Sequence, residues 1–295
     1  MPTGFSVHFA VLGSRSLGPS AILPYYRRPF DFRTFPTAES ADTEFDRWAS
    51  AMNDRALAII PARGGSNRIP RKNIRIMSGM PLIYWAVRTA LASDEFERII
   101  VSTDDAEIAA IAIESGAEVP FTRSADLADD FASTISVVAD AIRRVGSPGE
   151  FEFTCCIYPS GIFATKTDLI EARRLLETNP SLPYVAPVLR YSHPIQRALE
   201  ISEDGKLSFI DPAGSIQRTQ DLATRFHDAG QFYMGRTEAW LSAVPILENA
   251  IGLEMPSWGV VDIDNEDDWI RAQELHRIQL RHHESPAQAA DPQMH

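Results

Sequence analysis

The chain has 295 residues, of which 44% are hydrophobic and 23% are charged. This composition is that of a globular protein with one large or two small domains, without the run of about 20 apolar residues that a membrane span needs. The 28 basic and 40 acidic residues give a net charge of -12, which argues against sequence-independent binding of nucleic acid. The two cysteines, Cys155 and Cys156, are adjacent in an apolar run. They form neither a disulfide framework nor a zinc site, and a reducing cytoplasm is the expected compartment.

Residues 1–51 differ from the rest of the chain. They contain five prolines and no lysine, and they show no sustained hydrophobic period. The apolar stretch 5–12 lacks a preceding basic region, so it does not predict a signal peptide. We expect residues 1–51 to be a disordered leader or a start-site artefact, with a small docking segment as the alternative. The catalytic domain is expected at 52–284, followed by a disordered tail at 285–295.

From residue 56 onward, short apolar runs alternate with patterns of helical spacing. The predicted strands are 56–60, 98–102, 153–158, 184–189, 232–234 and 260–263. The predicted helices are 81–92, 105–115, 133–145, 166–178 and 266–283. This alternation predicts an α/β fold with a mostly parallel, doubly wound sheet.

Polar residues follow four of the predicted strands, at 61–73, 102–104, 158–160 and 262–264. In doubly wound sheets, ligands bind beyond the carboxyl ends of the strands. These four segments are therefore expected to meet in one site.

The loop at 61–73 reads PARGGSNRIPRKN, and five basic residues lie between positions 62 and 75, where the chain average predicts roughly one. Gly65 and its neighbouring glycine let the backbone approach a ligand, and successive N–H groups up to Ser66 can form an anion nest. Arginines such as Arg63 suit bidentate phosphate contacts, and Lys72 supplies a mobile positive charge. The loop matches neither the dinucleotide-binding glycine pattern nor a P-loop. It predicts phosphate binding, with a solvated basic loop as the alternative.

Asp262 and Asp264 lie two residues apart in the last predicted strand, so their side chains share one face. One or two carboxylates, together with water and substrate phosphate, are typical of a Mg²⁺ site. In the alternative, Asp264 caps the helix that follows, with Asp267 at the capping-box position. The pair alone does not decide between these two interpretations.

A third polar cluster precedes and enters the strand at 232–234. Its candidate residues for binding an acidic, hydroxyl-rich ligand are Arg218, Gln220, His227, Asp228 and Gln231. His227 beside Asp228 suits a general base, although a hydrogen-bonded structural histidine is the more common outcome. Tyr158, at the end of the strand that holds the cysteines, is a weaker candidate for substrate binding.

The loop segments AIIPARGGS (58–66) and IPRKN (69–73) resemble the signature loop of the CMP-sialic acid synthetases, a cytidylyltransferase family. The similarity continues at IVSTDD (100–105), GAEVP (116–120), LADD (127–130) and VDID (261–264), and it covers roughly residues 56–280. Within the family, RTQDL (218–222), HDAG (227–230) and the strand with the adjacent cysteines are most similar to the pseudaminic acid branch.

The resemblance implies a nucleotide-diphospho-sugar transferase fold, Rossmann-like, with a small dimerisation extension. It also implies a reaction in which CTP and a nine-carbon 2-keto sugar acid give the CMP-sugar and diphosphate, for surface or flagellar glycans. Homodimers are common in the family, with a segment at about 190–230 reaching across to the partner.

The resemblance also implies roles for individual residues. Ala62, Arg63 and Asn73 would hold the nucleotide, while Lys72 would neutralise charge on the triphosphate. Asp262 and Asp264 would bind Mg²⁺. Arg123, Ala132 and Thr134 match the positions that cradle cytosine, and Arg218 and His227 match the sugar side.

Two departures and several alternatives accompany the resemblance. Asn67 stands where the family usually has lysine, and Ile162 stands where relatives carry a second proline. The same reaction on N-acetylneuraminic or legionaminic acid is the nearest alternative. A catalytically inactive nucleotide-binding module is an alternative of another class, and a dehydrogenase is disfavoured because its glycine fingerprint is missing.

Overall fold

The computed structural model describes residues 55–284, except for 67, 130, 147–148 and 258. The predicted leader (1–51), the predicted tail (285–295) and Asn67 lie outside the described residues. Within the described part of the chain, no helix is both long and apolar enough to cross a membrane.

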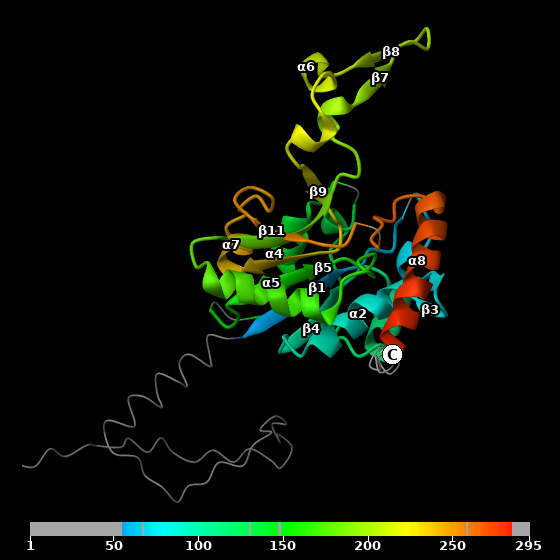
Figure 1. Cartoon of the computed structure of the whole chain (residues 1–295). Coiled ribbons are helices and arrows are strands. Elements are labelled where there is room, and N and C mark those ends of the chain that lie inside the picture. Colours follow the sequence, from blue (N-terminus) through cyan, green and yellow to red (C-terminus); the bar gives the residue numbers. More distant parts are fainter. Residues whose placement is uncertain (1–54, 67, 130, 147–148, 258, 285–295) are drawn as a thin grey trace, which may run out of the picture. The chain divides into compact units, whose positions relative to one another are not determined.

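The centre of the fold is a seven-stranded sheet with the order β11-β6-β10-β5-β1-β4, and β9 pairs with β6 (Figure 1). Its strands are β1 (Ala56–Pro61), β4 (Arg98–Ser102), β5 (Phe153–Ile157), β6 (Tyr184–Arg190), β9 (Phe226–Asp228), β10 (Phe232–Arg236) and β11 (Ile251–Glu254). The strands β11, β6, β5, β1 and β4 run in one direction, whereas β10 and β9 run against them. The predicted mostly parallel α/β fold is confirmed.

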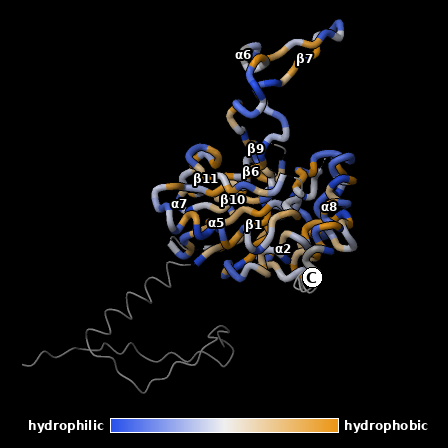
Figure 2. Tube along the Cα trace, in the orientation of Figure 1, coloured by the Kyte–Doolittle hydropathy of each residue, from blue (hydrophilic) through white to orange (hydrophobic). Residues whose placement is uncertain are grey.

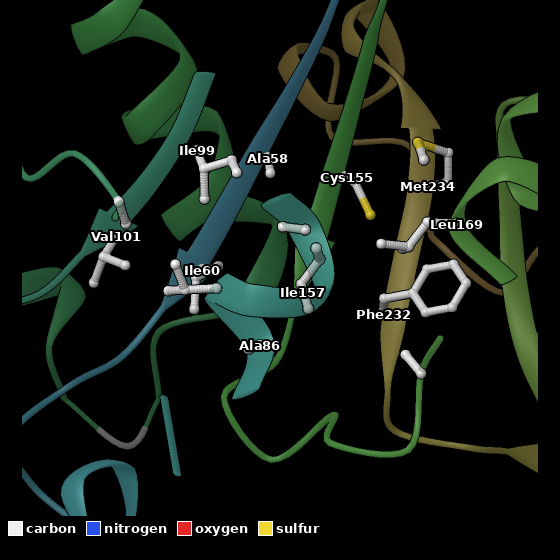
Figure 3. Packing of buried hydrophobic residues seen from close by; sticks show 14 of the residues in the cluster. Ala58, Ile60, Ala86, Ile99, Val101, Cys155, Ile157, Leu169, Phe232 and Met234 are labelled. Atoms are coloured by element: carbon white, nitrogen blue, oxygen red, sulfur yellow. The ribbon is translucent and has the colours of Figure 1, made fainter. Parts of the chain in front are cut away.

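Helices cover both faces of this sheet because alternate strand residues point to opposite sides. Ala58 and Ile60 of β1 pack in one cluster with α2 (Leu82–Ser93), α3 (Ala106–Glu114) and α5 (Lys166–Thr178). Figure 3 shows part of this cluster, with Ala86 of α2 and Leu169 of α5 near the strand residues. Leu57 and Ile59 pack on the other face, with α4 (Thr134–Val145) and α7 (Thr237–Leu241).

Polar caps set the helix boundaries that the sequence predicts. Asp105 caps α3 by accepting hydrogen bonds from the backbone N–H groups of Glu107 and Ile108, and Gly116 follows the helix at φ 103°. Ser133 caps α4 in the same way, and Thr165 forms a capping box at the start of α5. The predicted helices therefore agree with the structure to within one or two residues.

The predicted strand at 260–263 is wrong. These residues join no strand, and the sheet position beside β6 is taken by β11 instead. Val260 and Ile263 are buried in a separate cluster with Trp269 of α8 (Glu266–Glu284). Their hydrophobicity reflects packing beneath this helix rather than pairing in the sheet.

The segment between β6 and β9, residues 191–225, is called the arm below. It contains the hairpin β7 (Leu199–Ile201) and β8 (Leu207–Phe209), the short helix α6 (Pro212–Ser215) and the 3₁₀ turns η3 (Ile195–Arg197) and η4 (Thr219–Asp221), and it projects from the sheet (Figure 1). Both hairpin strands are exposed along their whole length. Hydrophobic stretches are nevertheless frequent there (Figure 2), and Ile201, Leu207 and Ile210 are all more than 60% exposed.

The remaining elements lie next to the basic loop. They are the 3₁₀ turn η1 (Lys72–Ile74) and the small hairpin β2 (Ile76–Met77) and β3 (Met80–Pro81), and a further turn η2 (Ala125–Leu127) precedes α4. Together with the carboxyl ends of β1, β4 and β5, the basic loop and η2 frame the polar cavity described next.

Candidate functional site

A cavity of about 550 Å³ lies beyond the carboxyl ends of β1 and β5. The predicted site residues that line it are Arg63, Gly65, Ser66, Lys72, Asn73, Arg123, Ala132, Thr134, Tyr158 and Asp264. Ala62 is buried directly beneath, and its N–H donates to the carbonyl oxygen of Ser102 at 2.9 Å. Segments from near both ends of the described chain, such as those with Arg63 and Asp264, thus meet in one pocket, as expected for a doubly wound sheet.

The five basic residues of the loop divide into two groups. Arg71, whose backbone is left-handed at φ 55°, pairs with Asp105 and Glu107. Arg75 pairs with Glu266 at 2.7 Å and lies over the Trp269 ring. These two arginines hold the loop from outside, whereas Arg63, Arg68 and Lys72 line the pocket.

The glycines of the loop allow a close approach to the acidic residues after β4. The N–H of Gly64 donates to Oδ1 of Asp104 at 2.9 Å. A Cβ at Gly64 would lie 2.8 Å from Oδ2 of Asp105, which is closer than side chains tolerate. Only glycine fits there, so the loop can run tightly against the start of α3.

Arg63 links the loop to the opposite wall of the pocket. Its backbone oxygen accepts from the Asn73 amide at 2.9 Å, and its guanidinium donates to the Asp129 carbonyl at 2.7 Å. The Asp129 carboxylate in turn accepts from the N–H groups of Phe131 and Ala132 at 2.9 and 2.7 Å. Asp129, which the sequence analysis did not single out as a site residue, thus organises the turn that carries Ala132.

Lys72 lies beside Asp262 and Asp264. Its ammonium donates to the Ile263 carbonyl at 2.8 Å. Burial lowers the pKa of Lys72, while Asp264 and Asp262 raise it. The ammonium therefore sits between the basic loop and the carboxylate pair, where a charged phosphate could also reach it.

The aspartate pair is free of the capping role considered above. Asn265 accepts from the Asp268 N–H at 3.0 Å, and the Asp268 carboxylate accepts from the Asn265 N–H at 3.2 Å. This reciprocal pair caps α8 in place of Asp264 and Asp267. The carboxylate of Asp264 instead pairs with Arg68 of the basic loop at 2.7 Å.

The same pair fits the ligand preference of Mg²⁺. Burial raises the pKa of Asp262, and the negative charge of Asp264 raises it further. Within the described residues, no group of three or more His, Cys, Asp or Glu side chains forms a complete metal cage. Mg²⁺ commonly relies on only one or two carboxylates and completes its shell with water and substrate phosphate, so the absence of a cage is compatible with it.

The wall opposite the aspartates is built around Arg123 and Thr134. Arg123 is 5% exposed, and its guanidinium donates to the hydroxyl of Ser102 at 3.1 Å and to its carbonyl oxygen. Burial lowers the pKa of Arg123 to about 10, so the side chain stays charged at neutral pH. The Thr134 hydroxyl lies 2.7 Å from that of Tyr158.

The remaining predicted site residues lie outside this pocket. Arg218 and Gln220 are exposed on the arm, and His227 is exposed with Nδ1 donating to the Asp228 carbonyl at 2.9 Å. Gln231 is fully buried, and its amide bonds to the N–H of Phe163 and to the carbonyl of Ala229. The structure therefore does not bring Arg218 or Gln220 to the basic loop of the same chain.

Comparison with known proteins identifies similar sequences over most of the described chain. A family model described as cytidylyltransferase matches residues 57–146. The pseudaminic acid cytidylyltransferase of Campylobacter jejuni serotype O:2 is 37% identical over 231 residues, which cover 78% of this chain and 98% of the relative. A Helicobacter pylori protein named pseudaminic acid cytidylyltransferase and UDP-2,4-diacetamido-2,4,6-trideoxy-beta-L-altropyranose hydrolase is 33% identical over 71% of this chain and 40% of its own length.

Solved structures share the fold at much lower identity. A CMP:2-keto-3-deoxy-manno-octonic acid synthetase complexed with CTP matches with a TM-score of 0.57 and 18% identity, over 76% of this chain and 99% of that chain. At this identity the match concerns the fold alone.

Proposed function

Because this chain belongs to the cytidylyltransferase family, with pseudaminic acid cytidylyltransferases among its relatives, we propose that it activates pseudaminic acid. CTP and the nine-carbon sugar acid give CMP-pseudaminic acid and diphosphate. The observation that carries the proposal is one pocket in which Arg63, Arg68 and Lys72 lie with Asp264. This combination suits a triphosphate that arrives with a divalent cation.

Each wall of the pocket has a task in this reaction. The loop residues Arg63, Gly65, Ser66, Lys72 and Asn73, packed over Ala62, bind the triphosphate. Arg123, Ala132 and Thr134 bind the cytosine. Asp262 and Asp264 hold Mg²⁺, which when bound neutralises phosphate charge and polarises phosphoryl oxygen.

The chemistry asks the protein mainly for positioning and for charge neutralisation. The anomeric hydroxyl oxygen of the sugar acid forms a bond to the α-phosphorus of CTP and gives up its proton to solvent water. The bond from that phosphorus to the bridging oxygen breaks, and diphosphate leaves with the electron pair. Lys72 and Arg63 stabilise the negative charge that grows on the departing diphosphate.

We place the sugar side of the reaction at the interface of a homodimer. Arg218 and Gln220 lie on the arm rather than in the pocket of their own chain, and the arm exposes large apolar side chains. Exposed apolar patches of this kind mark interaction surfaces. Together with Tyr158, which lines the pocket, and with His227 and Asp228 in β9 at the base of the arm, Arg218 and Gln220 would complete the sugar site of a second copy.

Complementation between two inactive variants tests this arrangement. Arg218→Ala removes the arm residue, and Lys72→Ala removes the pocket residue. If each site combines one chain's pocket with the other chain's arm, mixing the two after dissociation restores roughly a quarter of wild-type activity. Mixtures that stay inactive contradict the shared site.

Diphosphate release tests the function itself. Purified protein with CTP and Mg²⁺ is offered pseudaminic, legionaminic and N-acetylneuraminic acids in parallel. Release with pseudaminic acid alone, abolished by EDTA, is the expected result. Release with another acid changes the substrate, and CTP binding without any release indicates an inactive nucleotide-binding module.

The setting of the reaction follows from the same proposal. Cys155 and Cys156 are free, buried thiols, which is compatible with the reducing cytoplasm where we place the enzyme. The product would serve a surface or flagellar glycan.

A further inference from the structure

A row of hydroxyl-bearing side chains leads from the nucleotide pocket into the sheet. The hydroxyls of Thr134 and Tyr158 are 2.7 Å apart. Tyr158 lies at the end of β5, next to Tyr233 on the neighbouring strand β10, with ring centroids 5.7 Å apart in an edge-to-face arrangement. The Tyr233 hydroxyl donates to Oδ2 of Asp228.

The bond between Tyr233 and Asp228 has one direction. A carboxylate only accepts hydrogen bonds, so the proton of Tyr233 is committed to Asp228. Burial raises the pKa of Tyr233, so the hydroxyl keeps this proton at neutral pH. The ring of Tyr158 packs edge-to-face against that of Tyr233 and fixes its position.

The Asp228 end of the row lies next to Asp262. The other oxygen of Asp228 accepts from the N–H of Gly230 at 3.1 Å, which closes a tight turn. Gly230 has φ 63°, and a Cβ there would lie 3.1 Å from Cγ of Asp262. The turn at 228–230 therefore lies directly against the carboxyl group of Asp262.

We propose that Tyr233 is a positioning residue that holds the turn at 228–230, and through it the Asp262 carboxylate, in the geometry needed to bind the divalent cation. The ring contact between Tyr233 and Tyr158 places this end of the site beside the wall that carries Thr134. This inference rests on the proposed function, since it assigns a divalent cation to the aspartate pair. Groups that orient metal ligands typically alter metal affinity by 10- to 100-fold when they are changed.

Tyr184 supplies a matched control on the same sheet. It lies in β6, which pairs with β10, and its buried hydroxyl has no hydrogen-bond partner among the described residues. Tyr184→Phe and Tyr233→Phe each remove one hydroxyl from neighbouring strands. Only the second removes a hydrogen bond to Asp228.

The test measures Mn²⁺ binding to the full chain in the presence of CTP and without any sugar acid. Electron paramagnetic resonance detects the Mn²⁺ that remains free. We expect Tyr233→Phe to weaken Mn²⁺ binding by about tenfold and Tyr184→Phe to leave it unchanged. Asp228→Asn, which removes the charged acceptor but keeps the turn's shape, should weaken it similarly. This second variant decides the question if Tyr233→Phe fails to fold, as judged by its thermal melting temperature.

In turnover, Tyr233→Phe should raise the Mg²⁺ concentration needed for half-maximal rate and leave the KM for CTP nearly unchanged. Mn²⁺ binding equal to wild type in both Tyr233→Phe and Asp228→Asn overturns the positioning role, while the diphosphate assay still decides the function. Equal weakening in Tyr184→Phe also overturns it, because any lost hydroxyl would then suffice. If the wild-type protein turns over substrate but binds no Mn²⁺, the positioning role of Tyr233 is refuted, while the proposed reaction still stands.

Discussion

The basic loop and the arm contrast sharply in how the chain holds them. The loop at 61–73 is fixed from several sides, by Asp104 at Gly64, by Asp105 at Arg71 and by Glu266 at Arg75. The arm has two strands exposed along their whole length and large apolar side chains open to solvent. The end of the site that we propose for the nucleotide is therefore preorganised within one chain, whereas the arm, which we propose for the sugar side, is open to solvent.

This contrast makes physical sense for a reaction that depends on charge. Phosphate binding needs several cations held in place before the ligand arrives, because ordering them afterwards would cost affinity. A surface completed by a second chain can remain loose until that chain packs against it.

The largest loss of activity is expected from a change at Asp264, one of the two carboxylates beside the basic loop. Asp264→Asn should lower kcat by at least about a hundredfold, because a neutral amide neither binds Mg²⁺ as well nor compensates phosphate charge. The melting temperature should stay within about 1 °C of wild type, since Asn265 and Asp268 form the cap of α8. Diphosphate release and a thermal melt measure the two quantities.

Asp268→Ala is the matched control for that variant. It removes the cap and should lower stability by about 1 kcal/mol while turnover is retained. If Asp264→Asn loses stability but keeps its rate, Asp264 belongs to the cap and not to the metal site.

The second effect separates the two groups of basic residues in the loop. Lys72→Ala should lower kcat by about a hundredfold, because it removes a buried charge next to the aspartates. Arg71→Ala removes an arginine that pairs outside the pocket, so its main effect should be a modest rise in KM for CTP. Steady-state kinetics with varied CTP distinguish the two. Equal losses in both variants would mean that the loop acts as one undivided basic patch.

The third effect concerns the arm. Leu207→Glu places a charge on an exposed apolar strand that we expect to be covered in the dimer. The variant should shift toward monomer in analytical ultracentrifugation and lose about tenfold in kcat/KM for the sugar acid. CTP binding should be unchanged, because the pocket lies within one chain. A variant that remains dimeric with normal kinetics shows that the arm has another role.

Sequence patterns predicted the parts of the fold in which local chemistry and tertiary packing agree. Caps such as Asp105 and Thr165 mark helix starts by their own hydrogen bonds, so their positions can be read locally. The run at 260–263 could not be assigned in this way, because Val260 and Ile263 are as apolar as strand residues but pack beneath α8. Strand β11 escaped notice because it is short and half exposed.

The site shows the same limit. The segments after β1 and β5 border the pocket as the strand ends predicted, whereas Asp264 reaches it without following a strand. Arg71 and Lys72 are neighbours of the same charge, and the left-handed backbone at Arg71 accompanies their different directions. Tyr233 follows the alternation of an ordinary core strand, and nothing in the sequence distinguishes its bonded hydroxyl from the unbonded one of Tyr184. Such distinctions arise from partners that are distant in the chain.

Substitution of His276 in α8 is expected to change turnover the least, because this histidine affects the stability of the fold rather than the reaction. Its ring is 3% exposed, lies 4.6 Å from the Trp85 ring and bonds the Ser78 hydroxyl at 3.0 Å. Burial lowers the pKa of His276 from 6.5 to about 4. The unfolded chain therefore binds a proton below pH 6.5 that the folded chain takes up only near pH 4.

The contribution of His276 to the free energy of unfolding is therefore present above pH 6.5 and is lost as the pH falls toward 4. Between pH 7 and pH 5 the loss is about 2 kcal/mol. His276→Gln should reduce that pH dependence by about this amount and leave turnover at pH 7 within about twofold. Urea unfolding at the two pH values measures it, with His193→Gln on the exposed arm as the control. An unchanged pH dependence in His276→Gln would mean that this histidine is already protonated in the folded chain, and that its contact with Trp85 is a charged one.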